Sequence, residues 1–179
     1  MRRKGLIVFR AGLLLALAAF ASGPSILTAQ TRGPAVVDSR AVGLQPDTTA
    51  VQELLRLTNS VRLRHGLSTL RLVERLNQCA HWMAADMAVH GYFGHKDRLG
   101  RLVDGRADAF GYRWRAIAEN LAGGQESPQE AIQDWMDSPG HRRNMLDPNF
   151  TEIGLARVKF PGSKYREYWV QVFGVRRAD

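Results

Sequence analysis

The chain has 179 residues, 45% of them hydrophobic, with a formal net charge of +8. Four of the positive charges, Arg2, Arg3, Lys4 and Arg10, lie in the first ten residues, so the rest of the chain carries +8 − 4 = +4. Such mild basicity does not indicate a nucleic-acid-binding protein. The single cysteine, Cys79, excludes an intrachain disulfide, and its apolar helical setting predicts a small buried hydrophobe.

Residues 1–29 have the three parts of an export signal. A basic start is followed by the apolar run Ala11–Ala21 and by the small-residue sequence Leu27-Thr28-Ala29. The apolar run is short for a membrane span of about 20 residues. The sequence therefore predicts a signal peptide cleaved before Gln30 and no stable membrane span afterwards, with an uncleaved anchor as the alternative.

Residues 30–48 are polar and show no periodicity, so they predict a flexible leader before one domain over residues 49–177. The first helix of this domain is expected to open at Thr49, with Gln52 as its capping partner, and to stop at Gly66. A second helix is expected from about Val73 to Gly91.

Two further helices are expected in the middle of the chain. A short one is predicted from Val103 to Phe110. Ser127-Pro128-Gln129-Glu130 combines an N-cap, a first-turn proline and a glutamate, and begins a helix that runs to about Asp137. Trp135 and Trp169 are most simply core residues.

The C-terminal part predicts two strands, Ile153–Phe160 and Tyr168–Val175, joined by a turn over 161–164. In the last strand, valines at 170 and 172 alternate with Trp169 and Phe173, so both of its faces are apolar. An apolar strand of this kind is typical of the middle of a covered sheet. The predicted fold class is α+β, with a sheet between helical layers.

Three fragments carry the candidate functional residues. His95 ends the sequence His90-Gly91-Tyr92-Phe93-Gly94-His95, and Glu119 lies in a mostly apolar run at 118–124. His141 follows a helix end and a tight turn in Trp135-Met136-Asp137-Ser138-Pro139-Gly140-His141-Arg142. Ser138 and Pro139 suit the start of a new helix, which would hold the histidine in a fixed position.

In this order, together with Phe150-Thr151-Glu152-Ile153-Gly154, these fragments resemble the bacterial, secreted, single-domain branch of the CAP superfamily. This superfamily includes cysteine-rich secretory proteins, venom antigens and plant pathogenesis-related proteins. The resemblance covers roughly Val51 to Val175 and implies a three-layer α-β-α sandwich with a cleft.

The resemblance also implies which residues meet in that cleft. His95 matches the first cleft histidine, Glu119 the first acid and His141 the second histidine. A second glutamate of the eukaryotic members is replaced here by Ser138, so Asp137 and Glu152 are the candidates to supply the missing acid.

Two imidazoles with one or two carboxylates have two chemical uses. They could bind Zn²⁺ or a similar divalent ion, with His95 and His141 as ligands. They could equally form a metal-free hydrogen-bonded cluster in which Glu119 orients a histidine. The chain has neither His-Glu-x-x-His nor Gly-x-Ser-x-Gly, so the sequence does not support a standard metalloprotease or serine hydrolase.

We therefore expect a secreted or periplasmic protein whose cleft binds a small molecule, a lipid or a cell-envelope component. The alternative is a metal-assisted extracellular hydrolase, and a third reading is an adhesion or toxin-like interaction module. A run of arginines offers either attraction to an anionic surface or an ordinary solvated face; its members are Arg98, Arg101, Arg106, Arg113 and Arg115.

Overall fold

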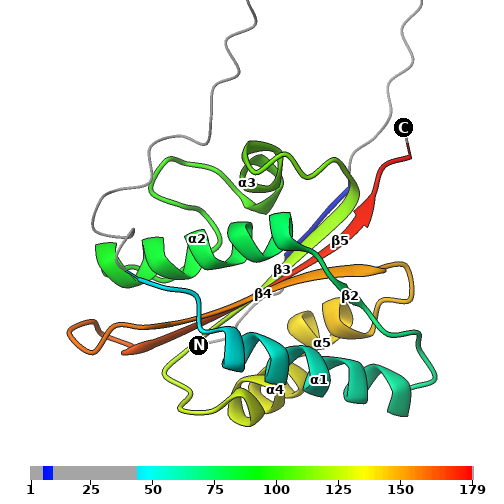
Figure 1. The fold of residues 1–179 in the computed structure, drawn as a ribbon, viewed down its shortest axis with the longest axis horizontal. Helices are drawn as coiled ribbons and strands as arrows, with labels where there is room; N and C mark the ends of the chain where they lie inside the picture. The colour runs from blue at the N-terminus through cyan, green and yellow to red at the C-terminus, as the bar shows by residue number, and fades with distance from the viewer. Residues whose placement is uncertain (1–5, 10–43, 179) are drawn as a thin grey trace, which may run out of the picture.

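The computed structural model describes residues 6–9 and 44–178. Its helices are α1 (Thr48–Arg64), α2 (Glu74–His90), α3 (Val103–Ala109), α4 (Pro128–Asp137) and α5 (Pro139–Leu146). Its strands are β1 (Leu6–Phe9), β2 (Arg71–Leu72), β3 (Trp114–Gly123), β4 (Glu152–Lys159) and β5 (Glu167–Arg176). One sheet lies between α2 and α3 on one side and α1, α4 and α5 on the other (Figure 1). The expected α-β-α sandwich is confirmed.

The strands of the described chain form one sheet in the order β1-β3-β5-β4-β2. The pairs β1–β3, β3–β5 and β4–β5 are antiparallel, and the short β2 runs parallel to β4. The last strand of the chain therefore lies in the middle of the sheet, as its apolar faces predict.

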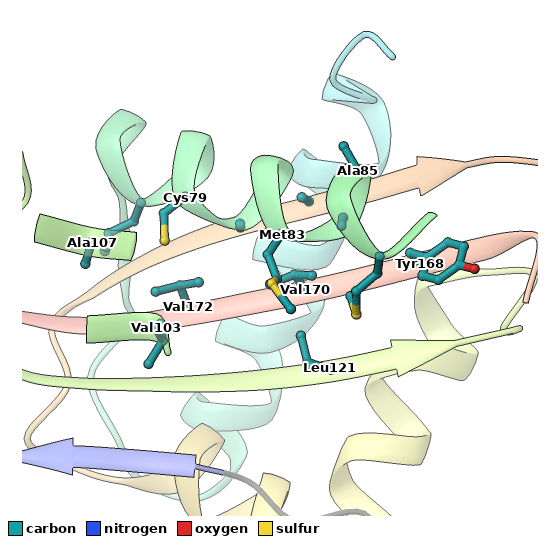
Figure 2. Close-up of a cluster of buried hydrophobic side chains, with 14 of the residues drawn as sticks. Cys79, Met83, Ala85, Val103, Ala107, Leu121, Tyr168, Val170 and Val172 are labelled. Carbon is teal, nitrogen blue, oxygen red and sulfur yellow. The ribbon is translucent and has the colours of Figure 1, made fainter. Parts of the chain in front are cut away.

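Two separate apolar cores, one on each face of the sheet, stabilise the three layers. Tyr168, Val170 and Val172 of β5 point into the core under α2 and α3, part of which Figure 2 shows. The alternate residues Trp169 and Phe173 point into the core formed with α1, α4 and α5. This alternation follows from the two-residue period of a strand.

The helix boundaries are close to those expected, with one different cap. Asp47, and not Thr49, caps α1: its carboxylate accepts a hydrogen bond from the Ala50 amide at 3.0 Å. Ser127 caps α4 as predicted, accepting from the Glu130 amide at 3.2 Å. Gly91 ends α2 with a φ of 70°, a left-handed conformation that glycine adopts at little cost.

Three strands were not expected from the sequence, and one of them is the two-residue β2. β3 includes the acidic fragment around Glu119, whose short, alanine-rich apolar run carries little strand signal. β1 falls within the predicted signal peptide, yet its backbone pairs with β3, with Leu6 opposite Glu119 and Phe9 opposite Ala116. Cleavage before Gln30 stays a prediction, and residues 30–43 of the predicted leader lie outside the described residues.

Among the residues that the structure describes, no helix has both the length and the apolar character needed to cross a membrane. Cys79 is fully buried in the core under α2, as expected for a small hydrophobe (Figure 2). Burial raises the pKa of its thiol to about 12, so the reactive thiolate is scarce at neutral pH.

The backbone of α2 lies very close to the sheet at Gly154 of β4. A Cβ atom built on this glycine would lie 2.0 Å from the carbonyl carbon of Leu76 and 2.2 Å from its oxygen. Both atoms belong to the backbone of α2, so no side-chain rotation can relieve the overlap. Glycine at this position allows α2 to pack directly on β4.

We predict that Gly154→Ala destabilises the domain by about 3 kcal/mol or more, because the added methyl group pushes α2 away from the sheet. Urea unfolding followed by circular dichroism measures the loss. Gly162→Ala is the matched control, since a Cβ there meets no atom within 4 Å. Equal stability of the two variants would contradict the packing described at Gly154.

Candidate functional site

The site is built around a carboxylate that is inaccessible to solvent. Glu119 of β3 points into the same layer as Ile117 and Leu121, and its side chain is 0% exposed. One carboxylate oxygen, Oε1, lies 2.9 Å from Nδ1 of His95. His95 comes from the loop after α2, and its side chain is 25% exposed. The structure thus joins two of the expected cleft residues directly.

The other carboxylate oxygen of Glu119 bonds to a buried arginine that the sequence analysis did not assign to the site. The Nη2 atom of Arg106, on α3, donates to Oε2 of Glu119, and both side chains are 0% exposed. Its Nη1 atom donates to the carbonyl oxygens of His95 and Arg101, both at 3.0 Å. One guanidinium group therefore fixes both the acid and the backbone of the histidine loop.

The charge balance explains why Arg106 stays charged in an apolar layer. Burial alone would lower the pKa of Arg106, but the negative charge of Glu119 opposes this and holds the pKa above its ordinary value. A buried ion pair needs such close geometry to offset the loss of hydration. The result is a fixed carboxylate that can orient the His95 ring.

His141 approaches the same point of β3 from the opposite face of the sheet. Its ring is buried at the start of α5, and its carbonyl oxygen accepts a hydrogen bond from Asn120 Nδ2 at 3.1 Å. Asn144 of α5 donates to Asn120 Oδ1 at 2.8 Å and to the Glu119 carbonyl at 3.3 Å. These bonds hold α5 against β3 beside Glu119.

The hydrogen-bond network around Asn120 continues on the α1 side of the sheet. Asn120 Nδ2 also donates to Gln171 Oε1 at 3.0 Å, and Gln171 Nε2 donates to Thr58 Oγ1 at 2.9 Å. All of these side chains are fully buried. The network links β3 and β5 to α1, so the placement of α5 depends on interior hydrogen bonds as well as on apolar packing.

The two candidates for the missing second acid lie elsewhere. Glu152 begins β4, separated from β3 by β5, and accepts a hydrogen bond from the Tyr112 hydroxyl at 2.6 Å and another from Arg71. Asp137, the last residue of α4, is exposed and accepts a hydrogen bond from Gln133 at 2.9 Å. Neither carboxylate is bonded to His95 or Glu119, so Arg106 is the charged group that completes the site.

The zinc site that the two histidines suggest stays a prediction, and the contacts of Glu119 bear on it. Among the described residues, no three His, Cys, Asp or Glu side chains lie together in a way that could hold a metal ion. Both oxygens of Glu119 are already bonded, one of them to the Arg106 cation, whose charge repels a divalent ion. A contact between a carboxylate and an imidazole is also what the alternative, a metal-free cluster in which a carboxylate orients a histidine, requires.

The arginine run is mixed: Arg98, Arg113 and Arg115 are exposed, as an ordinary solvated face requires, whereas Arg106 is not. Arg98 pairs with Asp86 at 2.9 Å, Arg101 pairs with Asp97 at 2.8 Å, and Arg106 is buried. A signal for Arg106 was present in the sequence. It lies three residues after Val103 and directly before Ala107, on the apolar stripe of a short helix, where a charge needs a buried partner.

Comparisons with known proteins point to one family. The family model described as the cysteine-rich secretory protein family, CAP, matches residues 55–173. Over 122 residues the chain is 36% identical to the uncharacterized protein YkwD of Bacillus subtilis, a match that covers 68% of this chain and 46% of that protein. Over 113 residues it is 29% identical to the uncharacterized membrane protein YlbC of the same organism, covering 60% and 31%. The chain spans less than half the length of these curated relatives.

Solved structures share the fold. An extracellular protein from Bacillus anthracis that contains an SCP domain aligns with a TM-score of 0.64 and 27% identity, covering 73% of this chain and 41% of that one. An outer surface protein from Borrelia burgdorferi aligns with a TM-score of 0.68 and 20% identity, covering 75% and 98%. The second likeness concerns the fold alone.

We predict that Arg106→Met destabilises the domain by about 3–5 kcal/mol, because it leaves the Glu119 carboxylate buried without its cation. The double variant Arg106→Met/Glu119→Leu should recover most of this loss, since it removes both charges. Denaturant unfolding of the single and double variants measures both effects.

Arg56→Met serves as the control for losing an ion pair as such. Arg56 bonds to Glu53 on the exposed side of α1, where water replaces the partner, and we expect little change in stability. A double variant no more stable than Arg106→Met would show that Arg106 acts mainly through its bonds to the loop carbonyls.

Proposed function

The chain belongs to the cysteine-rich secretory protein family, CAP, and on that premise we propose that it is an extracytoplasmic CAP domain of bacterial type whose His95 site binds a ligand without a resident metal. The observation that carries the proposal is the contact of 2.9 Å between His95 Nδ1 and a fully buried Glu119 carboxylate. A buried acid that holds a partly exposed imidazole in one orientation is an arrangement suited to recognition at the exposed edge of the ring.

The bond to Glu119 determines which hydrogen-bonding role each edge of the imidazole takes. A carboxylate only accepts hydrogen bonds, so Nδ1 carries the proton that it donates to Glu119. In the neutral ring, Nε2 is then an acceptor, and after protonation both nitrogens are donors. The site thus favours a ligand with a polar group that can donate to the imidazole, or an acidic group that pairs with its protonated form.

The loop that carries His95 also supplies aromatic surface. Phe93 packs on Tyr165 with ring centroids 5.0 Å apart, and both side chains are partly exposed. An apolar surface in the same loop as an oriented imidazole favours an amphipathic ligand over a simple ion. A small molecule, a lipid or an envelope fragment with both apolar and polar groups meets this requirement.

The alternative of a metal-assisted hydrolase has less support. It requires a divalent ion held by His95, Glu119 and His141, whereas Glu119 is bonded on both oxygens and Arg106 places a positive charge beside it. We therefore favour binding over hydrolysis, and a metal titration separates the two.

We propose that the domain works outside the cytoplasm, secreted or in the periplasm. The support is the three-part signal over residues 1–29 and the likeness to a Bacillus anthracis protein described as extracellular. We expect the exported protein to begin near Gln30, which mass spectrometry of its N-terminal peptide can check. An exported form that retains Met1 would refute cleavage.

We predict that zinc binds the purified protein weakly, and with equal affinity to the wild type and to His95→Ala/His141→Ala. The reason is that the described residues supply no third protein ligand beside the two histidines. Calorimetry at pH 7 measures both affinities. One-to-one binding to the wild type that disappears in the double variant would restore the metal site and the hydrolase with it.

We predict that a soluble digest of bacterial cell envelope shifts the amide resonances of His95, Glu119 and their neighbours. His95→Ala should abolish these shifts because it removes the polar anchor of the ligand. His65→Ala is the control, since this histidine is exposed at the end of α1, with its Nδ1 within 2.9 Å of the Val61 carbonyl. Shifts that persist in His95→Ala would place the ligand elsewhere.

A further inference from the structure

One edge of the sheet is formed by a strand that the exported protein is expected to lose. β1 lies at the end of the strand order, beside β3, and it belongs to residues 1–29, which carry the predicted export signal. We propose that removal of β1 opens a strand-binding site on β3, and that this site takes an extended apolar segment of another protein. The proposal rests on the export and cleavage proposed above.

The structure shows how such a segment fits, because β1 occupies the site. Its four residues run antiparallel to β3, with Leu6 opposite Glu119 and Phe9 opposite Ala116. β1 is drawn in blue beside β3 in Figure 1. On its other side β3 pairs with β5 along nearly its whole length, so β5 holds β3 in the sheet when β1 is absent. Cleavage therefore removes the neighbour and leaves the accepting strand in place.

The backbone of β3 supplies the binding groups. In an antiparallel pair, the N–H and C=O groups of alternate residues point toward the neighbouring strand. β1 is the only described strand beside β3 on this side, so its removal leaves such groups between Ala116 and Glu119 without a described strand partner. Unpaired edge groups form a template for another extended chain. Their hydrogen bonds provide the affinity of strand addition, and the fit of side chains provides its specificity.

The surroundings of the site favour apolar side chains at consecutive positions. α3 covers β3 on one face of the sheet, and α5 lies alongside β1 on the other. Ala116, Ile117 and Ala118 of β3 are each at most 6% exposed. A strand that lies between covered faces needs apolar residues on both of its sides, and β-branched or aromatic residues suit a strand best. β1 has this composition, with the sequence Leu-Ile-Val-Phe.

The strand-binding site adjoins the His95 site without using the same groups. The backbone of Glu119 pairs with β1, whereas its carboxylate bonds to His95 and Arg106. A peptide added to β3 therefore contacts the main chain of this residue and leaves the buried carboxylate with its partners. A ligand at His95 and a peptide on β3 can then bind the same molecule.

Binding of a synthetic peptide tests the proposal. The peptide has the sequence of residues 4–12, KGLIVFRAG, and its matched control carries Ile7→Pro/Val8→Pro, which removes backbone donors and disfavours a paired strand. We expect calorimetry to show that the exported protein binds the first peptide at least about tenfold more tightly than the control, because hydrogen bonds are lost. Amide hydrogen exchange of residues 116–119 should slow with the first peptide alone.

The full chain provides a test that does not depend on cleavage. In the wild-type full chain β1 fills the site, so the peptide should not bind. The same change, Ile7→Pro/Val8→Pro, made within the full chain should free the site and allow the peptide to bind. Thermal melting verifies that each protein is folded.

Four outcomes would overturn the proposal. The first is no peptide binding to the exported protein and the substituted full chain, and the second is equal binding of the two peptides. The third is slow exchange of residues 116–119 in the exported protein without peptide, which would assign the site to the leader or to a second copy. The fourth is an exported form that retains Met1: it would refute the opening of the site by cleavage, even where the substituted full chain binds the peptide.

Discussion

The buried ion pair between Glu119 and Arg106 is the interaction on which the rest of the site depends. A carboxylate in the apolar layer between α3 and β3 is tolerated only because a cation and an imidazole satisfy both of its oxygens. The same guanidinium group binds two carbonyl oxygens of the loop that carries His95. The position of the histidine, the path of its loop and the packing of α3 on the sheet therefore follow from one charged contact.

Much of the architecture follows from sequence patterns. The caps and apolar stripes of α2 and α4 predict these helices, and the alternation of residues 168–175 predicts a central strand. These signals are local, because they depend on residues a few positions apart. β3 lacks such a signal: its alanines are small, and its polar residues Glu119 and Asn120 are buried by contacts that no local pattern encodes.

The site was predictable in part for the same reason. The motif resemblance identified His95 and Glu119, which the structure joins, and His141, which it brings to the other side of the same strand. The partner of Glu119 was missed because Arg106 lies among other arginines in the sequence, and only its spacing from Val103 distinguishes it. Glu152 was included because a motif contained it, although Tyr112 and Arg71, its partners, come from distant parts of the chain.

Glu119 and Asn120 are adjacent in β3, yet they serve opposite faces of the sheet. The first bonds to α3 and the histidine loop, and the second bonds to α5 and Gln171. A shift of β3 by one residue would turn the Glu119 carboxylate toward the side-chain amides on the α5 side of the sheet. It would also turn the Asn120 amide toward the Arg106 guanidinium, which would then lack its carboxylate. A register shifted by one residue in either direction would thus leave buried polar groups mismatched. Two consecutive side chains therefore fix the register of β3 in the sheet.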